Sequence, residues 1–173
     1  GDDAQTAICG DGNDHVIQEG GDGNDVMYAE GDAGYVTLMV QGGLGNDNID
    51  AWGGRYGSKI SISGGDGDDI INSSVAGGAS VVHSVKIDAG LGDDQINHNL
   101  GGGADSVYVD GGLGSDFLEI GTDYYNCRLL DGSGAVLYSI GSGGTTITIV
   151  NVEHGLIESG RPAAGTYKVA FQW

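Results

Sequence analysis

Apolar residues recur along this chain in short runs in which every second position is apolar, and glycine-rich turns separate the runs. Leu38 and Val40 form one such pair, and Ile60 and Ile62 form another. Successive side chains of a β-strand point to opposite faces, so the pattern predicts short strands that each have one apolar face. Helical periodicity is scarce over the same length. The pattern therefore predicts an all-β fold.

The apolar positions also keep a fixed distance from the turns. Counted from the second glycine of a turn, they fall three and five residues before it and six residues after it. The three resulting columns are Val40, Ile62, Ile87 and Val109; Leu38, Ile60, Val85 and Val107; and Val16, Met27, Ile49, Ile71, Ile96 and Leu118. If successive coils stack, each column becomes an apolar ladder, and we expect these ladders to form the core.

The turns themselves repeat a nonapeptide, G-G-x-G-x-D-x-U-x, in which U is a large apolar residue. Residues 64–72 match it fully, and further copies span 9–17, 20–28, 42–50, 89–97 and 111–119. The second glycines of these copies are Gly10, Gly21, Gly43, Gly65, Gly90 and Gly112. Their spacing predicts a half-coil of about 11 residues and a coil of about 22, with one longer coil between Gly65 and Gly90.

At these residues the chain resembles the RTX, or haemolysin-type, calcium-binding repeats of secreted bacterial proteins. The resemblance covers residues 1–120. It implies a right-handed parallel β-roll, a β-helix-like solenoid, in which calcium ions lie between successive turns. A coil of about 22 residues makes this roll wider than is usual in that family.

The spacing predicts two chemically different edges. One edge, called the aspartate edge, carries the sixth-position residues Asp3, Asp25, Asp47, Asp69, Asp94 and Asp116. The opposite edge carries one good motif, which ends in Asp14, and then degenerate turns at residues 30–34, 53–57, 76–80 and 101–105. We expect calcium along the aspartate edge and little or none along the opposite edge.

The residue types of the turns suit calcium. Calcium takes six to eight oxygen ligands at about 2.3–2.6 Å in a flexible geometry. Glycine permits positive φ, which turns carbonyl oxygens inward without an obstructing Cβ, and aspartate adds a carboxylate. Hard oxygen ligands favour calcium over zinc. The candidate metal-binding residues are Asp3, Asp14, Gly21, Gly23, Asn24, Asp25, Gly43, Gly45, Asn46, Asp47, Gly65, Gly67, Asp68, Asp69, Gly90, Gly92, Asp93, Asp94, Gly112, Gly114 and Asp116.

The family resemblance implies that aspartates of successive turns share each ion. It pairs Asp3 with Asp25 and continues along the edge to the pair of Asp94 and Asp116, giving about four or five Ca²⁺ ions. The fifth-position residues Asn24, Asn46, Asp68 and Asp93 are expected to contribute carbonyls, or charge without direct ligation. Ser115 departs from that pattern, and Ala89 in place of the first glycine should weaken the site near Asp94.

Composition adds constraints on partners. The chain has 25 acidic and six basic residues, a formal net charge of −19, and 36 glycines among its 173 residues. Such a charge argues against binding nucleic acid or an anionic membrane. Charge repulsion and glycine entropy oppose collapse unless a cation is bound. No apolar run is long enough to cross a bilayer, and no signal-peptide pattern is present. The missing initiator methionine and residues 1–3, which match the end of a repeat, suggest a larger parent chain upstream.

Beyond residue 120 the repeats stop, and we expect residues 121–173 to form a C-terminal β cap on the same domain. Segments 126–138 and 145–158 still alternate, with turns at 132–134 and 141–144, and residues 167–173 should form a final aromatic strand. Residues 149–153 are a candidate for one more coil-like rung. The cap would cover the last apolar rung and block edge-to-edge stacking. Cys9 and Cys127 should be free thiols, because several coils separate them.

Three hypotheses on function follow. The first is a calcium-binding structural module of a secreted or cell-surface protein that folds outside the cell, with type I secretion implied by the resemblance. The second is an adhesin or carbohydrate-binding module that uses Arg55, Tyr56, Tyr35 and His83 on the opposite edge. The third is a non-catalytic module of a polysaccharide-modifying or hydrolytic enzyme. No catalytic constellation stands out, and His15, His83, His98 and His154 are expected on the surface or in packing roles.

Overall fold

The structure is a computed structural model. It describes residues 1–77, 80–101, 105–122, 127–131, 136–140, 145–161 and 165–172, of which 122–140 and 157–172 are described through the backbone alone. The predicted turns at 132–134 and 141–144, parts of the degenerate turns at 76–80 and 101–105, and Trp173 lie outside these residues. No helix in the described ranges has the length and apolar character needed to span a membrane.

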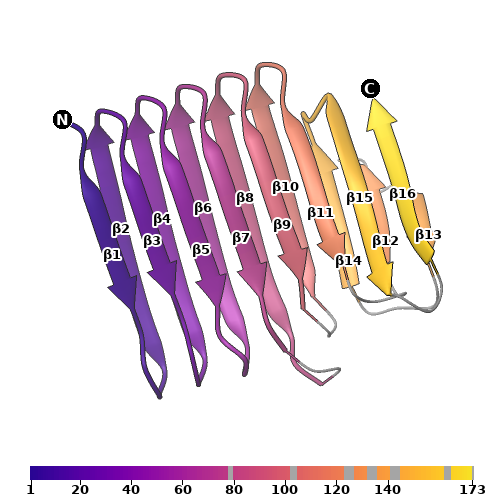
Figure 1. Ribbon diagram of the computed structural model, residues 1–173, viewed down its shortest axis with the longest axis horizontal. Coiled ribbons are helices and arrows are strands. Elements are labelled where there is room, and N and C mark those ends of the chain that lie inside the picture. Colours follow the sequence, from indigo (N-terminus) through magenta and orange to yellow (C-terminus); the bar gives the residue numbers. More distant parts are fainter. Residues whose placement is uncertain are drawn as a thin grey trace.

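The described residues form strands and turns, arranged as two eight-stranded sheets (Figure 1). Sheet A has the order β1-β3-β5-β7-β9-β11-β15-β16, and sheet B has the order β13-β12-β14-β10-β8-β6-β4-β2. The strands are β1 (Ala4–Ile8), β2 (Asp14–Asp22), β3 (Val26–Glu30), β4 (Val36–Leu44), β5 (Asn48–Gly53), β6 (Ser58–Asp66), β7 (Ile70–Val75), β8 (His83–Leu91), β9 (Gln95–Leu100), β10 (Ser106–Leu113), β11 (Phe117–Thr122), β12 (Cys127–Asp131), β13 (Val136–Ile140), β14 (Thr145–Val150), β15 (His154–Arg161) and β16 (Gly165–Gln172).

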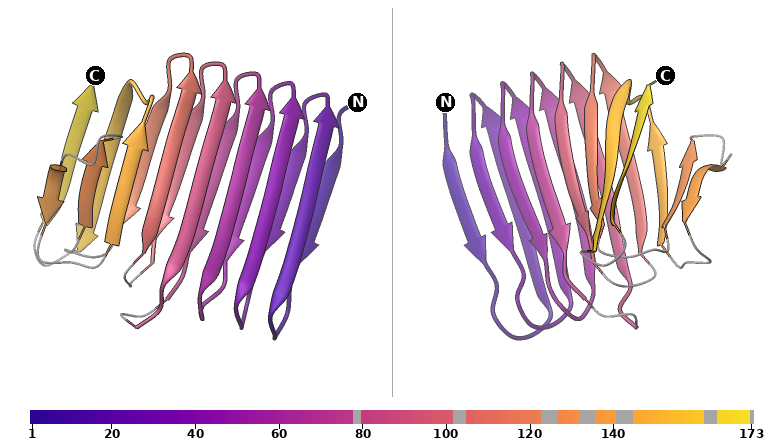
Figure 2. Two further views of the ribbon diagram at one scale, coloured as in Figure 1. Left: turned by 180° about the vertical axis from the view of Figure 1, so that it is seen from behind. Right: turned by 45° about the vertical axis from the view of Figure 1, so that its right-hand side comes forward.

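The chain alternates between the two sheets, so that two consecutive strands and their turns make one coil of a parallel β-solenoid (Figure 2). Val26 pairs with Asn48, and Asn48 pairs with Ile70, which confirms the predicted coil of about 22 residues. The next step joins Ile70 to Gln95 and is longer, as the glycine spacing predicted. Since Ser58 pairs with His83, the additional residues lie between β7 and β8, at the opposite edge.

The core occupies the space between the sheets. The three predicted columns are buried there, and Ile49, Ile71 and Ile96 are fully inaccessible. Val16 is only partly buried, because β2 is the terminal strand of sheet B and has no coil beyond it. Burial alternates along β6, where Ser58, Ile60, Ile62 and Gly64 are buried and the residues between them are less so, which confirms the predicted inward and outward faces. Burial of these apolar side chains is the main stabilising contribution.

The C-terminal region continues the solenoid for one coil and then departs from it. β14 pairs in parallel with β10, and β15 pairs in parallel with β11, so the predicted rung at 149–153 is confirmed. The turn between β14 and β15 is shorter than the equivalent turn between β10 and β11. In it, Asn151 adopts a φ of 51°, whereas the other turns have glycine at positive φ. β13 and β16 then add to the two sheets in antiparallel orientation. Antiparallel partners interrupt the parallel stack, as a cap requires.

Cys9 lies at the end of β1, is a free thiol and packs against the core. This confirms the prediction for Cys9. The side chain of Cys127 lies outside the described part of the chain.

Candidate cation-binding edge

The aspartate edge is the row of turns in which each sheet B strand ends and the next sheet A strand begins. These turns run along the top of Figure 1 and are nearly alike. Asp47 and Asp69 occupy equivalent places in consecutive coils of this row. Asp14 is the first residue of β2 and directly follows the turn from β1, which places it on the opposite edge as predicted.

A ladder of hydrogen bonds connects the sixth-position aspartates. The backbone N–H of each aspartate donates to Oδ1 of the aspartate one coil further on. The donor–acceptor distances are 2.6 Å for Asp3 to Asp25, 2.7 Å for Asp25 to Asp47, 2.8 Å for Asp47 to Asp69, 2.8 Å for Asp69 to Asp94 and 3.0 Å for Asp94 to Asp116. These bonds hold each carboxylate between neighbouring coils.

The ladder ends on a residue that the repeat pattern did not reveal. The N–H of Asp116 donates to Oε2 of Glu153 at 2.8 Å. Glu153 belongs to the additional rung between β14 and β15, so a glutamate takes the aspartate's place in a turn that lacks the nonapeptide. The alternating segment around residues 149–153 was the only signal for it in the sequence.

The second carboxylate oxygen of the ladder is left without a partner. Oδ2 is buried and makes no hydrogen bond in Asp25, Asp47, Asp69, Asp94 and Asp116. A buried oxygen that lacks a hydrogen bond costs about 1–3 kcal/mol, and more when it carries charge. Five equivalent oxygens in this state indicate that protons or cations must compensate them.

The space beside four of these oxygens, those of Asp25, Asp47, Asp69 and Asp116, is lined by another oxygen. A Cβ on Gly42 would meet both Oδ2 of Asp47 and the carbonyl oxygen of Gly64 in the next coil. The same convergence occurs at Gly20, Gly64 and Gly111. Because Gly42 has an ordinary φ, it is required here for close approach rather than for a left-handed conformation. At these four positions one coil thus offers a carboxylate and the next coil offers a carbonyl.

Burial changes the acidity of these groups. Desolvation, with a smaller contribution from neighbouring carboxylates, raises the pKa of Asp69 to about 7 and the pKa of Asp116 to about 6. Desolvation also raises the pKa of Asp47 and of Asp94. Without a cation, the ionised forms are therefore disfavoured. A divalent ion between the coils would reverse that preference, because its charge favours the carboxylate form.

The fifth-position residues make a second ladder that runs in the opposite direction. The side-chain oxygen of Asn24 accepts from the N–H of Asn46 at 2.9 Å, and that of Asn46 accepts from the N–H of Asp68 at 3.0 Å. Asp93 accepts from the N–H of Ser115 at 2.9 Å, so the exceptional serine still takes part in the ladder through its backbone. These exposed side chains stabilise stacking, and their carboxylates add charge close to the row of buried aspartates.

The predicted glycines form the turns themselves. Positive φ values occur at Gly21, Gly23, Gly43, Gly45, Gly65, Gly67, Gly90, Gly92, Gly112 and Gly114. At Gly43, a Cβ would also collide with the carbonyl oxygen of Gly21 in the preceding coil. Glycine is therefore needed in these columns both for the backbone conformation and for the close stacking of coils.

No three His, Cys, Asp or Glu side chains of the described residues lie close enough together to hold a metal by themselves. The aspartates stand in single file instead. A cation here would take carboxylates together with backbone carbonyl oxygens, and that mixed set of hard oxygens suits calcium.

On the opposite edge, the residues equivalent to the aspartates are Asp14, Val36, Ser58, His83, Asp105 and Thr145. Asp14 has Val36 as its neighbour, so no carboxylate ladder can form at that end. Asp105 does adopt the ladder geometry, because its Oδ1 accepts from the N–H of His83 at 3.1 Å. Asp105 is not among the candidate metal-binding residues above, although it ends a glycine-rich turn.

Two histidines lie in a buried polar cluster rather than apart from each other. His83 and His98 are both fully inaccessible, and Nδ1 of His98 lies 2.6 Å from Oγ of Ser73. Burial, with a smaller contribution from the nearby His83, lowers the pKa of His98 to about 4. Burial also lowers the pKa of His83, while Asp105 opposes this effect. The packing role predicted for both residues holds, but the proposed surface contact through His83 is wrong, because a ligand cannot reach its ring.

Fold and edge together define the class of molecule: a parallel β-solenoid with a single-file row of buried carboxylates along one edge. Comparison of the chain with protein-family models, with curated proteins and with solved structures finds no match.

Proposed function

We propose that the chain is a calcium-binding structural module of a secreted or cell-surface protein, which folds when it binds calcium outside the cell. The observation that carries the proposal is the row of five buried Oδ2 atoms without a hydrogen-bond partner. Four of them converge with a carbonyl oxygen of the next coil, and the sequence repeats that hold them resemble calcium-binding repeats.

Calcium would act as a clamp between coils. The carboxylate belongs to one coil and the converging carbonyl belongs to the next, as at Asp47 and Gly64. A cation bound by both opposes separation of the coils and compensates the charge repulsion of a chain with a net charge of −19. Since the unfolded chain does not hold these oxygens together, the binding free energy becomes folding free energy.

Calcium is favoured over magnesium by the kind of ligands present. Magnesium requires nearly ideal octahedral geometry and retains several waters, whereas calcium accepts irregular sets of carboxylates and carbonyls. The extracellular location belongs to the proposal because modules that bind calcium at about 10⁻⁴–10⁻³ M are filled only where calcium is abundant. In a calcium-poor cytoplasm the same chain would stay unfolded and ready for export.

The test is a calcium titration of the chelated chain, followed by far-UV circular dichroism and by calorimetry. We expect a cooperative gain of strand signal at submillimolar to millimolar calcium, uptake of about four or five ions, and reversal by chelator. Magnesium at the same concentration should give a much smaller change. A chelated chain that is fully ordered and gains no thermal stability from calcium would refute the proposal.

A further inference from the structure

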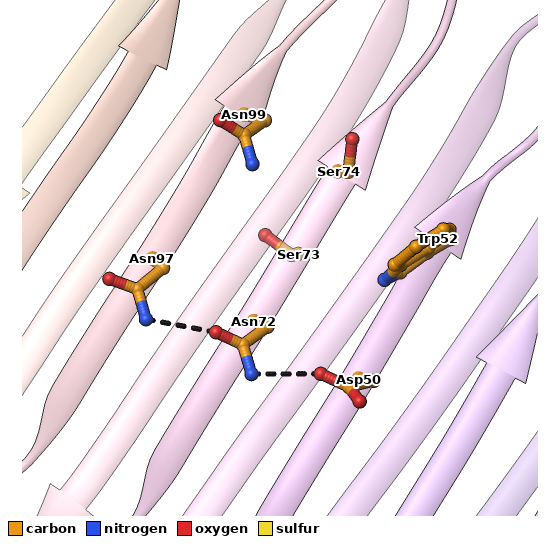
Figure 3. Close-up of a pocket in the computed structure, with 7 residues that line it drawn as sticks. All are labelled: Asp50, Trp52, Asn72, Ser73, Ser74, Asn97 and Asn99. Carbon is orange, nitrogen blue, oxygen red and sulfur yellow. Dashed lines mark hydrogen bonds between the residues drawn. The ribbon is translucent and has the colours of Figure 1, made fainter. Parts of the chain in front are cut away.

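The outer face of sheet A carries a shallow depression of about 400 Å³ that is separate from the aspartate edge (Figure 3). It extends over β5, β7 and β9. Its lining includes Asp50, Trp52, Asn72, Ser74, Asn97 and Asn99. The volume falls within the range of ligand pockets, which combine an aromatic or apolar surface with a few placed polar groups.

The polar part of the depression is held in place by its own hydrogen bonds. Nδ2 of Asn72 donates to Oδ1 of Asp50 at 2.8 Å, and Nδ2 of Asn97 donates to Oδ1 of Asn72 at 2.9 Å (Figure 3). A primary amide has two N–H donors, and the ladder uses one on each asparagine. The second N–H of each amide and Oδ2 of Asp50 therefore remain for a ligand, in orientations that are already fixed.

Trp52 supplies the aromatic part. Its side chain is 46% exposed, although an indole of this size normally buries most of its surface. The ring of Tyr28 lies beside it, with centroids 5.9 Å apart and planes tilted by 56°. Tyr28 is fixed in turn by the 2.6 Å hydrogen bond from its hydroxyl to Oε2 of Glu30. The indole is thus supported on one side and free on the other.

The combination matches the two-sided chemistry of a sugar ring. A pyranose offers an apolar C–H face that stacks on an aromatic ring, and equatorial hydroxyls that donate to carboxylates and exchange hydrogen bonds with amides. Polar groups on consecutive strands recur at about 4.8 Å, a distance similar to the length of one sugar unit. A row of such groups suits a chain of sugars better than a single small molecule.

The charge of the depression indicates which kind of carbohydrate it can bind. No lysine or arginine is among the residues that line the depression, and Asp50 contributes a carboxylate. Together with the net charge of −19, this disfavours uronic acids and sulfated sugars.

We propose that this depression binds a neutral oligosaccharide chain, with Trp52 as the stacking platform and the ladder of Asp50, Asn72 and Asn97 as the hydroxyl-binding row. The site goes beyond the calcium-binding role, because it lies on a sheet face and contains none of the ladder aspartates. It also differs from the opposite edge, where Tyr56 is exposed but the neighbouring His83 is buried.

The experiment measures binding of hexasaccharides to the full chain in saturating calcium by isothermal titration calorimetry. The neutral probes are the β-linked hexamers of glucose, xylose and mannose, and the charged comparator is hexagalacturonate. We expect at least one neutral probe to bind, with hexagalacturonate binding at least 10-fold more weakly. Trp52→Ala should weaken the neutral probe at least 10-fold, as expected for a central aromatic anchor. Asn72→Ala, which removes both ladder bonds, should weaken it several-fold.

Tyr108→Ala is the matched control, because Tyr108 is also a partly exposed aromatic residue but lies on sheet B. It should bind like the unaltered chain, and Tyr56→Ala should do the same. Circular dichroism and the response to calcium establish that each variant is folded, and Trp52→Leu, which also lacks an aromatic ring, serves if Trp52→Ala is not folded. The proposal is overturned if none of the neutral hexamers binds, if the Trp52 variants bind them unchanged, or if hexagalacturonate binds best. None of these results bears on calcium binding, which the chelator experiment decides separately.

Discussion

The backbone N–H of Asp47 donates to Oδ1 of Asp69 at 2.8 Å, across one coil of the solenoid, and leaves Oδ2 of Asp69 buried and unpaired. The hydrogen bond accounts for the position of the carboxylate but not for its charge. This separation of roles within one side chain allows the structural and cation-binding contributions of Asp69 to be measured independently.

Replacement of Asp69 by asparagine should affect the chain in opposite directions with and without calcium. The introduced side chain retains an oxygen for the Asp47 N–H, and its amide can donate toward the carbonyl of Ala89, which converges on the same space. Without calcium, the variant should therefore be at least as stable at pH 8, where an ionised Asp69 is unfavourable. With calcium, its affinity should fall 10-fold or more, equivalent to about 1.4 kcal/mol for each factor of ten. Urea unfolding in calcium and in chelator measures both effects.

Asp66→Asn is the control, since Asp66 carries the same charge in the same turn but is exposed. Asp66→Asn should leave both the stability of the calcium-free chain and the calcium affinity nearly unchanged. A loss of stability in chelator for Asp69→Asn, equal to its loss in calcium, would show that the aspartate is only structural.

Exchanges of glycine and alanine at the first position of the nonapeptide should change calcium affinity, and a methyl group at Gly42 should also weaken coil stacking, because it would meet the carbonyl oxygen of Gly64 in the next coil. Gly42→Ala places a methyl group where Oδ2 of Asp47 and the carbonyl of Gly64 converge, so calcium affinity should fall about 10-fold. Ala89 already has such a methyl group beside the rung of Asp94. Ala89→Gly should therefore raise calcium affinity, while it destabilises the chelated chain by about 0.5–1 kcal/mol through backbone entropy.

Gly10→Ala is the matched control for these exchanges, because a Cβ at Gly10 meets nothing within 4 Å. Competition with a chromophoric chelator reports the affinities. Unchanged affinity in both Gly42→Ala and Ala89→Gly would place the ions elsewhere.

The buried cluster around His98 should make the folded state sensitive to acid. Burial lowers the pKa of His98 to about 4, compared with about 6.5 for an unfolded chain. Because the folded pKa is the lower one, the stabilising contribution is fully present above pH 6.5 and is lost as the pH falls toward 4. Between pH 7.5 and pH 5.0 the expected loss is on the order of 2 kcal/mol.

The measurement compares the pH dependence of the free energy of unfolding between the unaltered chain and His98→Gln, both in saturating calcium. Titration of the carboxylates contributes to both proteins and cancels when they are compared. Between pH 7.5 and pH 5.0, the free energy of unfolding of the variant should fall by about 2 kcal/mol less than that of the unaltered chain. His83 and Asp105 remain in both proteins, so the difference reports His98 together with its charge repulsion of His83. His15→Gln, which alters an exposed histidine, should retain the full slope.

Adjacent isoleucines in β7 should differ strongly in their effect on stability. Ile71 is fully buried, whereas Ile70 is 43% exposed on the outer face. Ile71→Ala should destabilise the calcium-loaded chain by about 2–5 kcal/mol, because it opens a cavity in the apolar ladder. Ile70→Ala should cost less than about 1 kcal/mol. Equal effects in urea unfolding would mean that the strand register is wrong.

The sequence by itself determined the coil length, the longer coil after Gly65, the faces of the strands and the placement of Asp47 and Asp69 on one edge. These features follow from local alternation and from glycine spacing, since a period of two fixes which side chains turn inward. Only the tertiary structure showed that Oδ1 of each aspartate is hydrogen-bonded while Oδ2 is not, that Glu153 ends the ladder, and that His83 and His98 share a buried cluster. It also brought Trp52 next to an amide row. Each of these relationships joins atoms from different coils, about 22 or more residues apart in the chain, and such distances depend on how the coils stack rather than on any local pattern.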